Sequence, residues 1–130
     1  MLFRSRLPER YHELREYSNK GIYYAGFVED INTYTKAADL LLNPVITGGG
    51  VKTKMIEALG MGTTVVSTAS GAVGVDSKLT ADKLKIVQDE DWPVFAENIM
   101  QSTASDYQPT PPAFYAHFYW GNIINTIVDL

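Results

Sequence analysis

Three consecutive glycines, a lysine and a glutamate lie close together in one short stretch of the sequence. This stretch contains Gly48, Gly49, Gly50, Val51, Lys54 and Glu57. A glycine loop that leads into a helix favours anions, because the first helical N–H groups lack internal partners and the helix dipole attracts negative charge. Lys54 and Glu57 are three residues apart and share one helix face. On such a face the lysine could offset phosphate charge, and the glutamate could accept hydrogen bonds from sugar hydroxyls.

The same residues also have a simpler interpretation. Many α/β turns contain glycine for purely geometric reasons. A lysine and a glutamate three residues apart often form an exposed ion pair, which contributes about 0.2–0.5 kcal/mol. Hydrophobic periodicity does not decide between an ion pair and a face that binds a ligand.

The residues around this stretch predict a strand, a loop, a helix, a tight turn and a second strand. The run 39–42 is continuously apolar after Asp39, as in a strand covered on both faces, and Pro44 ends it. Apolar residues then recur with helical spacing at 51, 55, 58, 59 and 62. Residues 63–68 are β-branched or apolar and predict the second buried strand. The small-residue loop 69–76 would leave the same sheet edge as the glycines, where it either lines the same crevice or is only a connector.

The rest of the chain alternates between helix and strand patterns. The predicted elements are a helix after Pro8, closed at Gly21, a strand 22–28, a helix 31–36, a strand 84–87, a helix 89–100, a polar loop 102–112 and an aromatic-rich helical segment 113–130. This alternation predicts an α/β fold, with a Rossmann-like parallel sheet of about four to five strands and helices on both faces. We expect the aromatic side chains of the last segment to lie mostly in the core.

Length and composition restrict the class of protein. The chain has 130 residues, which is the size of one modest domain, and a net charge of −4 argues against a nucleic-acid-binding surface. There are no cysteines, and the two histidines, His12 and His117, lack metal-ligand spacing. We expect no metal site and no membrane-spanning segment, since no apolar run approaches about 20 residues. The early charges argue against a signal peptide, so a cytoplasmic protein is expected.

Six short motifs, in this order and spacing, resemble the C-terminal domain of GT-B fold, retaining glycosyltransferases of family 4, also called group 1. They are Gly26-Phe27-Val28-Glu29-Asp30, Ala38-Asp39, Asn43-Pro44, Gly48-Gly49-Gly50, Lys54-Met55-Ile56-Glu57-Ala58 and Gly62-Thr63-Thr64-Val65-Val66. The resemblance covers about a third of the chain tightly and most of the rest loosely.

The resemblance implies a role for each matching residue. Glu57 would bind the ribose hydroxyls of a nucleotide-sugar, Lys54 would assist, and Gly48 to Gly50 with Val51 would lie against the diphosphate and sugar. Phe27 and Val28 would lie beside the base, although Phe27 is equally well explained as a core residue. The family often has a second glutamate that supports the transferred sugar, and Gly49 occupies its position. No residue is assigned a catalytic role, and the donor is a substrate, so no cofactor is expected.

The resemblance also implies that residues 1–130 are a single, partial, nucleotide-sugar-binding C-terminal domain. The preceding strand and helix and the acceptor-binding N-terminal domain would then be absent. We expect the parent enzyme to transfer a hexose to a sugar, lipid or polysaccharide acceptor, in the cytoplasm or at a membrane surface, and this chain alone to be inactive. The alternatives are a non-catalytic GT-B-like module, which Gly49 favours, and part of a nucleotide-sugar epimerase.

Overall fold

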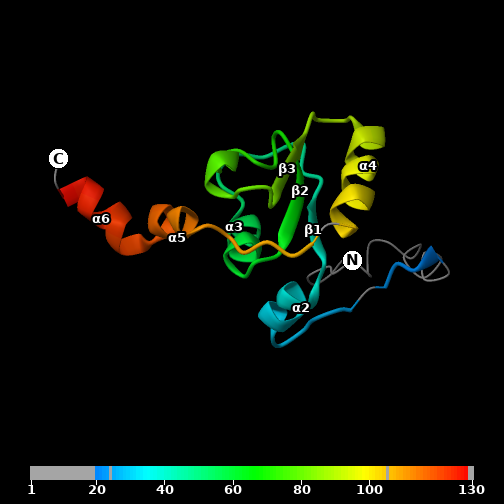
Figure 1. The fold of residues 1–130 in the computed structure, drawn as a ribbon, viewed down its shortest axis with the longest axis horizontal. Coiled ribbons are helices and arrows are strands. Elements are labelled where there is room, and N and C mark those ends of the chain that lie inside the picture. Colours follow the sequence, from blue (N-terminus) through cyan, green and yellow to red (C-terminus); the bar gives the residue numbers. More distant parts are fainter. Residues whose placement is uncertain (1–19, 24, 105, 129–130) are drawn as a thin grey trace. The chain divides into compact units, whose positions relative to one another are not determined.

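A computed structural model describes residues 20–23, 25–104 and 106–128, and the helix expected after Pro8 lies outside these residues (Figure 1). The chain divides into two units, Met1–Ile31 and Asn32–Leu130. None of the described helices is long and apolar enough to cross a membrane.

In the first unit the strand predicted over Ile22–Val28 is wrong, because none of its described residues lies in a strand. Gly26 has a φ of 70°, in the left-handed region, which breaks the extended backbone that a strand requires. Gly21 also has a positive φ, of 75°, whereas the helix that it was predicted to close lies outside the described residues. The side chain of Phe27 is 75% exposed, so the alternative that it is a core residue is not supported.

The second unit is built on a three-stranded parallel sheet in the order β1-β2-β3. Its strands are β1 (Leu40–Asn43), β2 (Thr64–Thr68) and β3 (Leu84–Val87). The helices are α2 (Ile31–Ala37), α3 (Thr53–Gly60), the 3-10 turn η2 (Ser77–Leu79), α4 (Trp92–Thr103), α5 (Pro112–Phe118) and α6 (Trp120–Val128). The predicted α/β fold and parallel sheet are confirmed, with three strands among the described residues instead of four to five.

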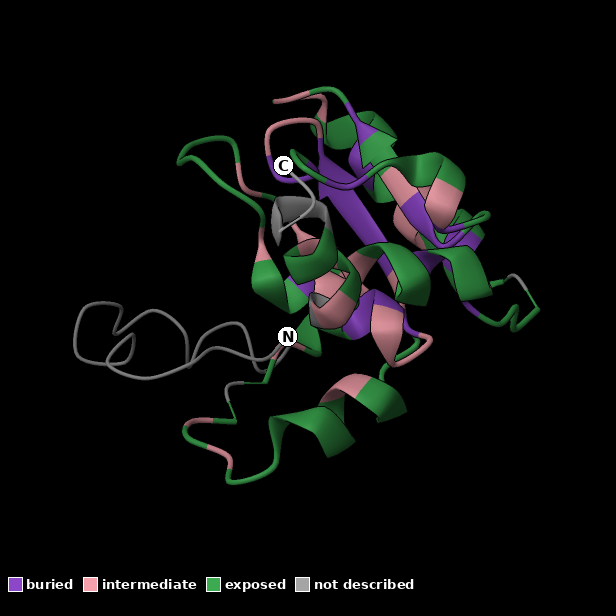
Figure 2. Ribbon diagram, turned by 90° about the vertical axis from the view of Figure 1, so that its left-hand side faces the viewer, coloured by how far each residue is buried: buried purple, intermediate pink, exposed green. Residues whose placement is uncertain are grey.

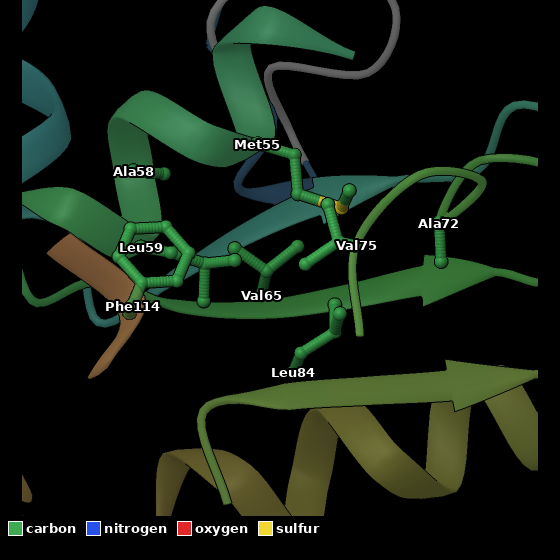
Figure 3. Packing of buried hydrophobic residues seen from close by; sticks show 8 residues of the cluster. All are labelled: Met55, Ala58, Leu59, Val65, Ala72, Val75, Leu84 and Phe114. Atoms are coloured by element: carbon green, nitrogen blue, oxygen red, sulfur yellow. The ribbon is translucent and has the colours of Figure 1, made fainter. Parts of the chain in front are cut away.

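The side chains of successive β2 residues point into two hydrophobic cores, one on each face of the sheet. Val65 faces one core with Met55, Leu59 and Phe114, so α3 and α5 cover this side of the sheet (Figure 3). Val66 faces the other core, which contains Val87 of β3 and Phe95 of α4. Figure 1 shows α3 and α4 on opposite sides of the strands, and Figure 2 shows a buried strand at the centre of this unit, as expected for β2, which is buried along most of its length. Helices on both faces of the sheet are thereby confirmed.

Two details of the sequence prediction around the glycine loop are wrong. The side chain of Leu42 is 40% exposed, although Leu41 packs against the first core and Leu40 against the second, so both faces of β1 are covered only in part. Val51 is 50% exposed and precedes α3, which begins at Thr53. Lys52 has extended backbone angles, with φ −85° and ψ 97°, so the helix cannot begin earlier.

The predicted C-terminal helical segment is two helices, because Tyr119 between them has the extended angles φ −74° and ψ 121°. Phe114 is buried in the first core and contacts the partly buried Phe118, with ring centroids 4.8 Å apart. Tyr115 and Tyr119 are exposed. The expectation that these aromatic residues are core is therefore correct for the phenylalanines and wrong for the tyrosines.

Candidate functional site

The glycine loop and the loop 69–75 leave the same edge of the sheet. The register pairs Asn43 at the end of β1 with Ser67, and Thr68 at the end of β2 with Val87 at the end of β3. All three carboxyl ends therefore meet at one edge, which is where open parallel sheets bind ligands. The candidate site is built on the segments that follow these ends.

Asn43 joins the two loops through its side-chain amide. Its Nδ2 donates to the hydroxyl of Ser67 at 3.0 Å and to the backbone carbonyl of Gly71 at 3.0 Å. The hydroxyl of Thr68 donates to the carbonyl of Val45 and accepts from the N–H of Gly71 at 3.2 Å. The chain leaving β1 and the chain leaving β2 are thus held together by side-chain hydrogen bonds.

Asp89, two residues beyond β3, fixes the other side of the loop 69–75. Its carboxylate accepts hydrogen bonds from the hydroxyl of Ser70 and, at 2.9 Å, from the backbone N–H of Ser70. These bonds, the side-chain one first, hold the pKa of Asp89 below its usual value because they favour the ionised form. Asp89 therefore links β3 to the loop as a carboxylate.

The glycine loop is exposed, and its backbone carbonyls accept hydrogen bonds from the side chain of Lys52. Gly48 and Gly50 have positive φ values of 97° and 75°, which glycine adopts without strain. The ammonium Nζ of Lys52 donates to the carbonyls of Gly48, Gly49 and Gly50 at 3.2, 3.0 and 3.1 Å. Within the described residues, none of the backbone N–H groups from Gly48 to Lys54 donates a hydrogen bond. These donors are therefore available to a ligand.

The two loops touch where the glycine loop ends. A Cβ placed on Gly74, which has a φ of 87°, would lie only 2.4 Å from Cγ2 of Val51. Gly74 is therefore needed both for its backbone angle and for the close approach of Val51. This contact supports the interpretation that the loop 69–76 borders the glycine loop, over that of a remote connector.

Lys54 and Glu57 lie on the exposed side of α3, opposite the buried Met55, Ala58 and Leu59. The salt bridge recorded within the described residues joins Lys85 to Asp82, and neither Lys54 nor Glu57 has an ionic or hydrogen-bonding side-chain partner there. The ion-pair interpretation is therefore wrong. Both charges also lie close to the glycine loop, because α3 rises about 1.5 Å per residue and Glu57 is within two turns of its start.

A separate cavity of about 650 Å³ lies at the opposite, amino-terminal edge of the strands, against Thr63, Lys83 and Tyr107. Lys83 is almost fully buried, and its ammonium donates to the carbonyl of Gly62 at 2.6 Å and lies 4.7 Å from the ring centre of Tyr107. Burial lowers the pKa of Lys83 because it disfavours the charged form. None of the predicted site residues lines this cavity.

The carboxyl-edge residues lie within the region recognised by a family comparison. A sequence profile of the family described as "Glycosyl transferases group 1" matches residues 4–104. The chain belongs to this glycosyltransferase family. No curated protein and no solved structure gives a significant match to the chain.

The structure brings together most of the site residues predicted for this group 1 glycosyltransferase. Gly48, Gly49, Gly50, Val51, Lys54 and Glu57 all lie in one segment of the second unit. Phe27 and Val28 belong to the first unit, so their place beside the base stays a prediction. Gly49, at the position of the family's second glutamate, accepts a hydrogen bond from Lys52 through its backbone carbonyl, which does not depend on the residue type.

Sequence reasoning missed two residues that shape the candidate site, Lys52 and Asn43. A lysine directly after a glycine loop was a usable signal for Lys52, because a cation there can bind the loop's carbonyls. Asn43 was recognised only as part of a motif. Its partners, Ser67 and Gly71, are distant in sequence and could not be identified from local patterns.

Proposed function

We propose that this chain binds a nucleoside-diphosphate sugar at the carboxyl edge of its sheet, as the donor-binding part of a retaining glycosyltransferase. The single observation that supports this most strongly is the glycine loop beside Lys54 and Glu57, because the loop N–H groups and both side chains have no partner among the described residues. Membership of the family supplies the reaction class. The whole enzyme would transfer a hexose to a sugar, lipid or polysaccharide acceptor.

Each group at the edge has a role suited to its chemistry. The N–H groups of the loop and of the first turn of α3 would donate to the diphosphate, and the ammonium of Lys54 would offset its charge. Glu57 would accept hydrogen bonds from two ribose hydroxyls, because an ionised carboxylate is an acceptor only. Val51 would lie beside the diphosphate and sugar.

These donors would also assist the transfer step. The bond between the anomeric carbon and the phosphate oxygen breaks, and its electron pair leaves with the nucleoside diphosphate. A new bond forms between that carbon and the acceptor oxygen, whose proton passes to an oxygen of the leaving diphosphate. Fixed N–H groups and a lysine stabilise the negative charge that develops on the leaving diphosphate. The acceptor would be bound by a separate N-terminal domain, so we expect transfer to require both domains.

The test is a calorimetric titration of the chain with UDP, GDP and ADP. We expect one of them to bind, and Glu57→Ala to lose about 1.5–3 kcal/mol of affinity, the range for a hydrogen bond that involves a charged group. Glu97→Ala is the matched control, because Glu97 is an exposed glutamate of α4, on the other side of the sheet. Equal affinities for the wild type and Glu57→Ala would contradict the ribose assignment.

Gly49 supports a second candidate function, a non-catalytic module that has kept the fold and lost donor binding. It has no side chain where the family often has a glutamate, and no heavy atom of the described part of the chain lies within 4 Å of a Cβ placed there. The same titration separates the two proposals, because such a module would bind none of the three nucleotides.

A further inference from the structure

The most specific polar arrangement at the carboxyl edge is the one around Lys52. An ammonium has three N–H donors, and the distances from Nζ to the carbonyls of Gly48, Gly49 and Gly50 are 3.0–3.2 Å. Each donor therefore has one carbonyl of the loop as its partner. Lys52 would have to give up these bonds in order to donate to a phosphate.

We propose that Lys52 is a positioning residue that holds the glycine loop in the conformation that receives the diphosphate, and that it does not bind the phosphate itself. The ligand part of this inference rests on the function proposed above. The direct phosphate contact is assigned instead to Lys54, whose ammonium has no partner among the described residues.

The planarity of the peptide bond explains how Lys52 acts on the loop. In a trans peptide the carbonyl of one residue and the N–H of the next point in opposite directions. With the carbonyls of Gly48, Gly49 and Gly50 turned toward Nζ, the N–H groups of Gly49, Gly50 and Val51 are turned away from it. These N–H groups have no partner within the described part of the chain. They are left available to an extended acceptor such as a diphosphate.

The loop needs the hydrogen bonds from Lys52 because a run of three glycines does not favour a single backbone conformation. Three adjacent glycines lose more conformational entropy on ordering than other residues do. Among the residues that the structure describes, no heavy atom comes within 4 Å of a Cβ placed on Gly49 or Gly50, so side-chain packing from this part of the chain does not fix them. The hydrogen bonds from Lys52 are the contacts that restrain this backbone among the described residues.

The first test needs no nucleotide. NMR relaxation of the full 130-residue chain measures the order of the Gly49 and Gly50 amides. For these two amides we expect order parameters of about 0.85 in the wild type and in the control Lys54→Met. In Lys52→Met we expect values below about 0.6. Unchanged order in Lys52→Met, or a loop already mobile in the wild type, would overturn the proposal. Lys52 is only half-buried, and the amide signals of β2 report whether the variant is folded.

A second test separates positioning from phosphate contact. Lys52→Arg keeps the charge, but a planar guanidinium cannot direct its donors to three carbonyls as an ammonium does. We expect Lys52→Arg and Lys52→Met each to bind the preferred nucleotide at least about tenfold more weakly, which is 1.4 kcal/mol. Full affinity in Lys52→Arg would show that the charge alone matters and would contradict the proposal. If the wild type binds no nucleotide, the proposed function fails, whereas the relaxation experiment still decides the role of Lys52.

Discussion

At the scale of single residues, Gly71 occupies a crowded point of the carboxyl edge. A Cβ placed there would lie 2.7 Å from Nδ2 of Asn43 and 2.7 Å from Oγ of Ser67, both of which belong to the hydrogen-bonded network between the loops. A side chain at this position would have to displace partners that are fixed by their own hydrogen bonds. Gly49 is the opposite case, since the space beside it is open.

This contrast predicts different stabilities for two alanine variants. We expect Gly71→Ala to lower the free energy of unfolding by about 1–3 kcal/mol, the usual cost of overpacking a fixed site. Gly49→Ala is the matched control and should change it by less than about 0.5 kcal/mol, as expected for an exposed position. Urea denaturation of both variants measures the difference. Equal stabilities would show that the network is not rigid.

At the scale of elements, the site depends on how segments that are far apart in sequence are joined. Asn43 joins the ends of β1 and β2 to the loop 69–75, and Asp89 joins that loop to the chain after β3. α3 contributes in a different way, because it packs one side against the sheet and presents Lys54 and Glu57 on the other. The edge is therefore assembled from three strand ends and one helix.

The hydrogen bonds between Asp89 and Ser70 predict that the free energy of unfolding depends on pH. Because its pKa is lower in the folded state, Asp89 stabilises the fold above the unfolded pKa, about 3.9, and this contribution is lost as pH falls through the folded pKa. Urea denaturation at pH 5 and pH 3 compares wild type with Asp89→Asn. The wild type should lose more stability than the variant on acidification. An equal loss in both proteins would exclude a contribution from Asp89.

At the scale of the whole molecule, local patterns predicted the elements that carry the site. The apolar run before Pro44, the helical spacing of Met55, Ala58 and Leu59 and the β-branched run 63–68 correspond to β1, α3 and β2. Each of these signals is local, and each element is covered by a helix or a neighbouring strand. The strand expected at 22–28 was not found, because Gly26 interrupts the extended backbone and strand pattern alone does not guarantee a partner.

The geometry of the site was less predictable than its residues. Gly48 to Gly50, Lys54 and Glu57 could be identified from their types and spacing. Whether Lys54 and Glu57 pair with each other depends on side-chain conformations, which the spacing does not determine. The contact of Gly74 with Val51 is a tertiary contact between residues that are far apart in the sequence. The bonds of Lys52 are local, but they require the particular positive-φ path of the loop.

The most direct test of the central claim is to map where a nucleotide binds. An ¹⁵N-labelled chain is titrated with UDP, GDP and ADP, and the amide shifts are followed. We predict that one nucleotide shifts the amides of 48–54 most strongly, with smaller changes in the neighbouring loop 69–75. Shifts centred on Lys83 and Tyr107 would place the site at the cavity of the opposite edge. That result, or the absence of any shift at 48–54, would contradict a donor site at the carboxyl edge.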